Sequence, residues 1–125
     1  MLTTNATAEL LTVMYAAFNR REIEKLMGMM HPQVDWPNAV EGGRIHGRAG
    51  VREYWWRQWS TLNPQVTPMG FENDPEGRTV VEVHQLVRDL SGNILVDRNV
   101  QHIYTIVDGL VTRMDVHEIG NPPNS

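Results

Sequence analysis

Asp108-Gly109 is the feature that most restricts how this chain can fold. The dipeptide separates two stretches in which apolar and polar residues alternate, 94–107 and 110–119. Alternation with a period of two is typical of β-strands, and Asp-Gly between two such stretches is the strongest short hairpin signal. We therefore predict a two-residue turn joining two long antiparallel strands at the C-terminal end.

Two more alternating stretches, at 65–73 and 79–89, precede this hairpin. Residues that favour turns separate the strands at 74–77 and at 91–92. The second half of the chain is therefore predicted to be a sheet whose successive strands are antiparallel.

The first half of the chain has a helical period instead. Apolar residues recur every three or four positions in 5–20, 22–30 and 48–62, with a short strand expected at 33–36. The predicted class is α+β, with three N-terminal helices packed on a curved, mainly antiparallel sheet that encloses a pocket.

Length and composition limit the remaining possibilities. With 125 residues the chain is expected to form a single domain, 1–125, with a flexible tail at about 120–125. The net charge of −4 and the scattered basic residues argue against nucleic-acid binding. The chain has no cysteine, no apolar stretch long enough for a membrane span and no signal-peptide pattern, so a cytoplasmic location is expected.

Two-residue turns also predict which side chains share a face of the sheet. One face would carry Glu82, His84, Leu86, Asp97, Asn99, Gln101, Ile103, Met114, Val116 and Glu118. Buried polar groups need partners, so this polar cluster beneath the helices indicates a pocket. The other face is rich in valine and would place His102 opposite Asp115 as a salt link. We expect a homodimer to cover that outer face. A slip of one residue in either register would exchange the faces.

The order of several short motifs resembles the NTF2-like superfamily, in its SnoaL-like and ketosteroid-isomerase-like branch. The matching stretches are Tyr15-Ala16-Ala17-Phe18-Asn19-Arg20, Met30-His31-Pro32-Gln33-Val34-Asp35-Trp36, Gly47-Arg48-Ala49-Gly50-Val51-Arg52-Glu53-Tyr54 and Val107-Asp108-Gly109-Leu110-Val111. The resemblance implies a cone whose pocket lies between the helices and the concave sheet. It does not specify a reaction, because one fold hosts many functions.

The carboxylates of two well-known activities of this fold are not retained. Where ketosteroid isomerases carry a carboxylate base this chain has Trp36, and their oxyanion-binding tyrosine and acid correspond to Met14 and Gln101. The Arg-x-Asp pair of limonene-type epoxide hydrolases is replaced by Glu82 and His84. Cyclisation of the SnoaL type needs only an acid or base in the cavity.

His84 is the predicted general acid or base, because histidine titrates near neutral pH. Glu82 and Glu118 are further catalytic candidates, and Asn99 and Gln101 are expected to donate hydrogen bonds to a ligand. The other predicted ligand contacts are Trp36, Asn38, Tyr15, Phe18, Tyr54, Trp55, Trp59, Met114 and Val116. Each candidate also has a structural interpretation, such as plain core packing for the tryptophans of the third helix.

Three functions remain open from the sequence. The first is an enzyme without cofactor or metal that acts by acid–base chemistry on a small, mostly apolar molecule, as an isomerase, cyclase, dehydratase or hydrolase. The second is a module that binds a small ligand without changing it. The third is a dimeric protein-interaction domain that uses the valine-rich outer face.

Overall fold

The computed structural model describes residues 5–39 and 41–118. The expected flexible tail and the N-terminal residues 1–4 lie outside this part of the chain. The elements follow in the order α1 (Asn5–Asn19), α2 (Ile23–Gly28), β1 (Met30–Pro37), β2 (Arg44–His46), α3 (Arg48–Thr61), β3 (Leu62–Asn73), β4 (Thr79–Asp89), β5 (Ile94–Val107) and β6 (Leu110–Glu118).

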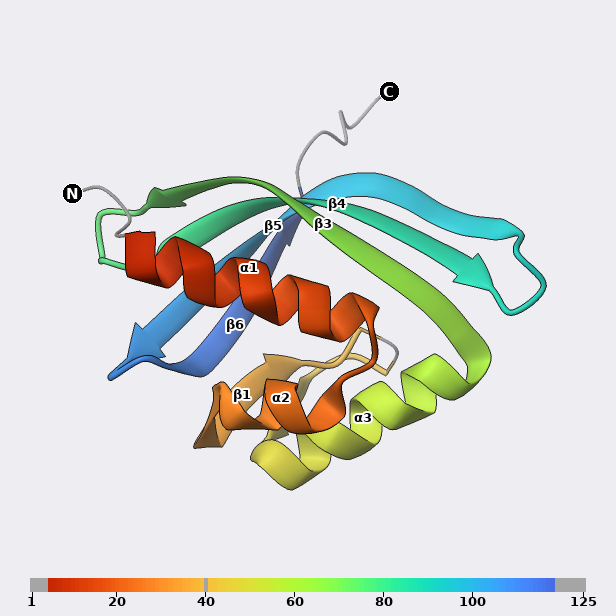
Figure 1. The fold of residues 1–125 in the computed structure, drawn as a ribbon, viewed down its shortest axis with the longest axis horizontal. Helices are drawn as coiled ribbons and strands as arrows, with labels where there is room; N and C mark the ends of the chain where they lie inside the picture. Colours follow the sequence, from red (N-terminus) through yellow and green to blue (C-terminus); the bar gives the residue numbers. More distant parts are fainter. Residues whose placement is uncertain (1–4, 40, 119–125) are drawn as a thin grey trace.

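The predicted α+β class is confirmed, with a sheet that is mixed rather than purely antiparallel. The six strands lie in the order β2-β1-β6-β5-β4-β3, and β1 runs parallel to β6. The sheet curves, and α1 runs across it while α2 and α3 lie beside β1 (Figure 1). The short strand β2 was not predicted; it forms within the glycine-rich loop and pairs with β1.

The helices bury the apolar stripes that the sequence showed. On α1, Leu11, Met14 and Tyr15 are almost completely buried. On α3, Val51 and Trp55 lie one turn apart and are buried as well. Each helix therefore presents one apolar face to the sheet and a polar face to water.

Two glycines allow α3 to start where it does. Gly47 precedes the helix with a φ of +87°, a conformation that side chains with a Cβ rarely adopt. At Gly50 a Cβ would stand 2.8 Å from Cγ2 of Ile45, so the first turn of α3 can approach β2 only without a side chain there.

The predicted pairing of β4 with β5 is confirmed. Glu82 lies opposite Gln101, and His84 lies opposite Asn99. The turn itself is longer than two residues, because the Asp89 carboxylate accepts hydrogen bonds from the backbone N–H groups of Ser91 and Asn93. A register shift between Val87 and Arg88, next to the turn, brings the following pairs back to the predicted register.

The predicted pairing of β5 with β6 is wrong by one residue. Asp108 and Gly109 do form a tight turn, with φ values of +53° and +77°, and Val107 lies opposite Leu110. The register then shifts beyond Ile106, where Thr112 is the extra residue and its hydroxyl donates a 3.0 Å hydrogen bond to the Thr105 carbonyl. This β-bulge moves every later side chain of β6 to the opposite face.

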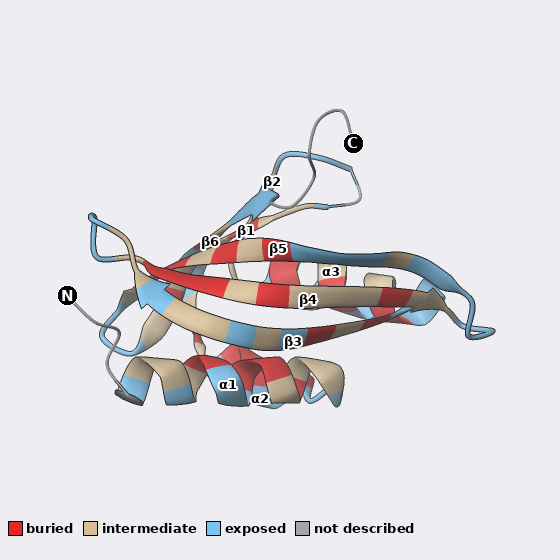
Figure 2. Ribbon diagram, turned by 90° about the horizontal axis from the view of Figure 1, so that it is seen from above, coloured by how far each residue is buried: buried red, intermediate tan, exposed pale blue. Residues whose placement is uncertain are grey.

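The inward face of the sheet is the valine-rich face, contrary to the prediction. Val81, Val83 and Val100 are fully or almost fully buried, and Tyr104 on the same face contacts Tyr15 of α1. Figure 2 shows buried positions alternating with partly exposed ones along β4 and β5. Burying these apolar side chains stabilises the fold more than burying the polar face would, so the polar face points away from the helices.

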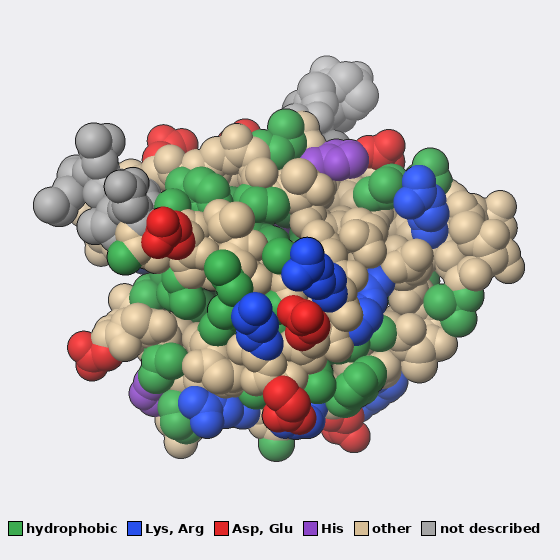
Figure 3. All heavy atoms as spheres, viewed as in Figure 1, with side chains coloured by type: hydrophobic (Ala, Val, Ile, Leu, Met, Phe, Trp, Pro, Cys, Tyr) green, Lys and Arg blue, Asp and Glu red, His purple; other side chains and the backbone are tan. Residues whose placement is uncertain are grey.

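Charges on one face of the molecule are mixed rather than gathered by sign (Figure 3). On the face drawn in Figure 3, basic and acidic side chains lie next to one another. None of the helices in the described residues has the length and apolar character needed to cross a membrane.

Candidate ligand-binding pocket

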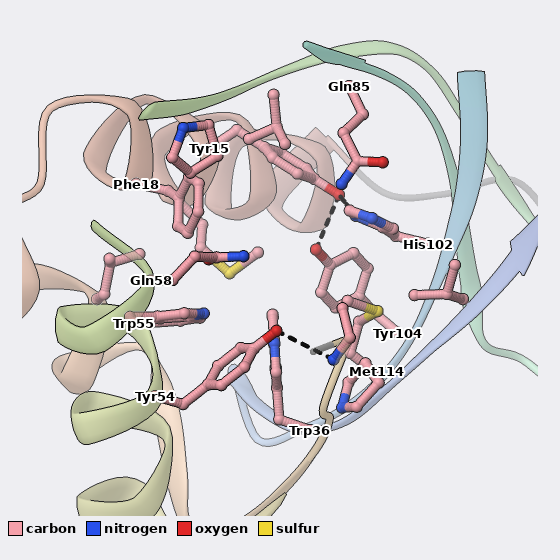
Figure 4. A pocket seen from close by; sticks show the side chains of 17 residues that line it. Tyr15, Phe18, Trp36, Tyr54, Trp55, Gln58, Gln85, His102, Tyr104 and Met114 are labelled. Atoms are coloured by element: carbon pink, nitrogen blue, oxygen red, sulfur yellow. Dashed lines mark hydrogen bonds between the residues drawn. The ribbon is translucent and has the colours of Figure 1, made fainter. Parts of the chain in front are cut away.

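A pocket lies between α1, α3 and the inward face of the sheet (Figure 4). Its cavity volume is about 100 Å³, enough for several water molecules or one small ring. It is lined by Met14, Tyr15, Phe18, Leu26, Trp36, Pro37, Ala39, Tyr54, Trp55, Gln58, Pro64, Val66, Gln85, His102, Tyr104, Met114 and Val116. None of these lining side chains is an acid, a lysine or an arginine.

Aromatic rings form a large part of the wall. The chain has four Trp, three Tyr and two Phe, and six of these nine side chains line the pocket. Trp36 and Trp55 meet edge to face with their ring centroids 5.1 Å apart, and Phe18 packs against Trp55 at 5.7 Å. Rings held in this way form a rigid slot suited to a flat ligand.

A buried hydrogen-bonded chain forms the polar end of the pocket. The Tyr104 hydroxyl lies 2.8 Å from the Tyr15 hydroxyl, which in turn lies 2.8 Å from Nδ1 of His102. Strand β5 positions two members of this chain, because residues two apart on a strand point the same way. Helix α1 brings the third member from the other end of the sequence.

Burial keeps all three groups uncharged at neutral pH. It lowers the pKa of His102 to about 4, so the imidazole is neutral. Burial also raises the pKa of Tyr104, and it raises the pKa of Tyr15 together with the nearby Tyr104. The polar end of the pocket is therefore a set of neutral hydrogen-bonding groups.

One arrangement of protons gives both hydroxyl groups of the Tyr104–Tyr15–His102 network a hydrogen-bond acceptor. If Tyr104 donates to Tyr15 and Tyr15 donates to Nδ1 of His102, both phenol protons have acceptors. The imidazole proton is then on Nε2, which has no hydrogen-bond partner among the described residues. In the reverse arrangement the Tyr104 proton would have no acceptor. The first arrangement leaves His102 able to donate a hydrogen bond to a ligand.

A second hydrogen-bond donor lies on the opposite wall. The Tyr54 hydroxyl of α3 accepts a 3.1 Å hydrogen bond from the backbone N–H of Ala39. Burial raises the pKa of Tyr54, so its own proton stays in place and is free to be donated. Gln58 and Gln85 add amide groups to the wall (Figure 4).

The structure brings together seven of the predicted ligand contacts. They are Tyr15, Phe18, Trp36, Tyr54, Trp55, Met114 and Val116. Asn38 and Trp59 are not in the wall: the Asn38 side chain accepts a hydrogen bond from the backbone of Glu41, and Trp59 packs against Phe18 and Arg21.

The predicted inward position of His84, Glu82, Asn99 and Gln101 is wrong. These four residues lie on the face of the sheet that points away from the helices. His84 contacts the Asp97 carboxylate at 2.6 Å, and Gln101 donates to Glu82 at 3.0 Å. The physical reason is the preference for burying the valine face, which alternation alone cannot reveal.

Glu118 does lie on the inward face, but beyond the pocket wall. The bulge at Thr112 places it, with Val116 and Met114, on the face of His102. There it pairs with Arg98 at 3.2 Å rather than lining the cavity.

His102 is the site residue that the sequence analysis misinterpreted. It lies opposite Val116 rather than Asp115, and Asp115 instead bonds Arg44 and Arg113 on the outward side. The available signal was the placement of His102 and Tyr104 among valines on one strand face. A valine-rich outer surface for protein interaction is also wrong, because those valines are buried.

Metal-ligating residues do not gather within residues 5–39 and 41–118, where no three His, Asp or Glu side chains converge. The pocket therefore offers neutral hydrogen-bonding groups at one end and apolar rings around them.

Comparison with solved structures gives the same fold at high coverage. TerC, which was co-crystallised with polyporic acid, is 29% identical over 91% of this chain and 92% of its own, with a TM-score of 0.77. An NTF2-like protein of Burkholderia pseudomallei is 20% identical over 92% of each chain, with a TM-score of 0.78. A candidate polyketide cyclase of Xanthomonas campestris is 20% identical over 89% and 88%, with a TM-score of 0.76.

Sequence comparison is decisive for the family. No curated protein sequence matches the chain significantly. The SnoaL-like domain, however, matches residues 11–114, which is most of the chain. The protein therefore belongs to the SnoaL-like family, and it shares the fold of an NTF2-like protein.

Proposed function

We propose that this protein is an enzyme that binds a small, flat, aromatic molecule and catalyses its rearrangement without a cofactor. The observation that carries the proposal is the neutral Tyr104–Tyr15–His102 chain, which ends at the aromatic slot. An aromatic slot selects for ring systems, and the donor at its end selects for a carbonyl or hydroxyl oxygen.

The proposed catalytic role of His102 is electrophilic. A neutral imidazole that donates from Nε2 stabilises the negative charge that develops on a carbonyl oxygen when an enol carbon of the same molecule adds to that carbonyl. The enol hydroxyl loses its proton as the C–C bond forms and the new alkoxide takes up a proton, so no protein base is consumed. Such stabilisation is strong in a buried site, because the donor is already oriented and the surroundings have a low dielectric constant. The two tyrosines hold the imidazole in the donating tautomer.

The lack of a strong base in the pocket wall limits the reactions that the pocket can catalyse. A group with a pKa of about 4 is a weak base at neutral pH, and the wall contains no carboxylate. Reactions that need mainly a polarised carbonyl, such as intramolecular cyclisation of a substrate that is already an enol, therefore fit better than those that need a strong protein base. Similarity to TerC and to a candidate polyketide cyclase supports an aromatic or polyketide-type substrate.

The test combines binding and turnover. Polyporic acid and a panel of aromatic ketones are offered to the wild type, and products are followed by mass spectrometry and NMR. For a substrate that is converted, His102→Leu is expected to lower kcat by about 100-fold, the usual effect of removing one oxyanion donor.

The matched control is His84→Leu, which removes a histidine from the outward face of the sheet and is expected to leave kcat unchanged. Equal rates for wild type and His102→Leu would reject the catalytic role of His102. If only His84→Leu lost activity, the catalytic site would lie on the outward face of the sheet instead.

A second candidate function is binding without reaction. It is favoured by one observation, the lack of any charged group in the pocket wall. A ligand that binds at the slot, depends on His102 and is recovered chemically unchanged after prolonged incubation would establish this function instead.

We also propose that the protein forms a homodimer through the outward face of β4, β5 and β6. That face carries the half-buried Ile103 among polar pairs such as His84 with Asp97 and Gln101 with Glu82. A second copy would cover Ile103 and leave these polar pairs satisfied.

A further inference from the structure

The inward face of the sheet continues past the pocket to a single ion pair. Arg98, Val100 and His102 point the same way from β5, because they are two residues apart. Arg98 lies opposite Gln85, which lines the pocket, and its Nε donates a 3.2 Å hydrogen bond to the Gln85 amide oxygen. Glu118 follows Val116, another wall residue, by two positions. The Arg98–Glu118 pair therefore extends the pocket wall toward solvent.

The Arg98–Glu118 ion pair can be broken so that Arg98 binds another carboxylate. A single contact of 3.2 Å joins Nη1 of Arg98 to the Glu118 carboxylate, and the two side chains are 41% and 55% exposed. Exposed pairs with one contact contribute little to stability, so breaking this one is easy. Nη2 of Arg98 has no partner among the described residues, so the guanidinium can still bind a carboxylate with two parallel hydrogen bonds.

Resting on the proposed function, we infer that Arg98 is a specificity residue that binds the carboxylate of an elongated aromatic acid, displacing Glu118. The aromatic body of this molecule lies in the slot, and its oxygen-bearing end meets His102. Because the slot itself contains no cation, the acid group is recognised only at the rim.

The spacing sets the length of this ligand. Arg98 and His102 are four residues apart on β5, which corresponds to roughly 13 Å along an antiparallel strand. Both side chains reach toward the ligand, so a rigid molecule of two linked rings with its polar groups at opposite ends matches the distance. The first ring fills the cavity and the second lies in the mouth beside Gln85.

A matched pair of probes tests this inference. Para-(para-hydroxyphenyl)benzoic acid and its methyl ester differ only in the charge at one end. Their affinities are measured by calorimetry for wild type, Arg98→Gln, Glu118→Gln and Arg88→Gln. The last variant makes the same charge change at the opposite face of β4, and thermal melting shows that each variant is folded.

The acid is expected to bind Arg98→Gln about five- to tenfold more weakly than wild type, because the lost contact is charge-assisted but partly exposed to solvent. The ester should bind both proteins equally. Glu118→Gln should strengthen binding of the acid by a few-fold, since it removes the competing carboxylate, and Arg88→Gln should change neither affinity.

The remaining outcomes separate this inference from the proposed function. If the ratio of acid to ester affinity is the same in wild type, Arg98→Gln and Arg88→Gln, Arg98 has no such role. Binding of the ester that still depends on His102 would then leave the proposed function intact. If neither compound binds the wild type, the proposed aromatic ligand and the role of Arg98 are both rejected.

Discussion

Burial keeps His102 uncharged at neutral pH, and this governs both its chemistry and its part in stability. A charged imidazole in this position would lose its hydration without gaining a carboxylate, because among residues 5–39 and 41–118 its hydrogen-bond partner is the Tyr15 hydroxyl. The same burial leaves His102 a hydrogen-bond donor at pH 7 rather than a base. The stability of the fold and the proposed role of His102 therefore depend on the same protonation state.

The first prediction concerns stability at acid pH. The pKa of His102 is about 4 in the folded protein and about 6.5 in an unfolded chain, so the unfolded state binds more protons between these values. Stability is therefore fully present above about pH 6.5 and falls as the pH drops toward 4. We expect a loss of about 3 kcal/mol in the free energy of unfolding across this window, measured by urea unfolding.

His102→Gln is expected to flatten this pH dependence, because glutamine does not titrate. The control Thr12→Ala removes an exposed hydroxyl that does not titrate, and it should leave the pH dependence unchanged. The Asp89 carboxyl group affects stability at a lower pH than this window, because hydrogen bonds from Asn93 lower its pKa below the ordinary value. A His102→Gln curve parallel to that of the wild type would contradict the assignment.

At the level of elements, one asparagine ties α1 to β3. The Asn19 amide donates to the Val66 carbonyl at 2.8 Å, and its oxygen accepts from the Val66 N–H at 2.9 Å. The side chain thus acts like a neighbouring strand for Val66, which lines the pocket. This pair of bonds sets the end of α1, which carries Tyr15 and Phe18, against the sheet.

Asn19→Ala is expected to destabilise the protein by about 2–3 kcal/mol, since it leaves two partly buried backbone groups without partners. Urea unfolding at neutral pH measures the change. The control is Thr12→Ala on the same helix, which removes an exposed hydroxyl bonded to the Ala8 carbonyl and should cost a few tenths of a kcal/mol. Equal stabilities for the two variants would show that the Asn19 bonds contribute little.

In β6, one extra residue determines which side chains of the strand face inward. Turn chemistry predicted the Asp108-Gly109 hairpin, and the first two pairs beyond it follow that prediction. The extra residue at Thr112 then reverses the faces of β6. The bulge is stabilised by packing across the sheet and by the Thr112 hydroxyl, and threonine in a strand gives no local sign of it.

At the scale of the whole molecule, the prediction is the proposed homodimer. Ile103→Glu places a charge at the centre of the outward face, where a second copy would have to desolvate it, so the dimer should dissociate at micromolar concentration. Light scattering after size-exclusion chromatography measures the mass. Val13→Glu, an exposed position on α1, serves as the control and should leave the mass unchanged. A wild type that is monomeric at high concentration would contradict the proposal.

Local sequence signals are sufficient to predict the class of the fold, the position of almost every helix and strand, the β4–β5 register and the aromatic character of the pocket. Periodicity and turn residues are local signals, so they can be recognised one segment at a time. Tyr15, Phe18 and Trp55 lie on the apolar stripes of predicted helices, whereas Trp36 was recognised through the resemblance to related proteins.

Which face of the sheet points inward depends on packing across the whole fold. Alternation specifies two faces equally well, and the choice depends on the total apolar area that the helices bury, which no single segment reveals. Because the valine-rich face points inward, His102 rather than His84 lies in the pocket wall. The same orientation also joins His102 to Tyr15, 87 positions away, through a contact that exists only in the folded chain.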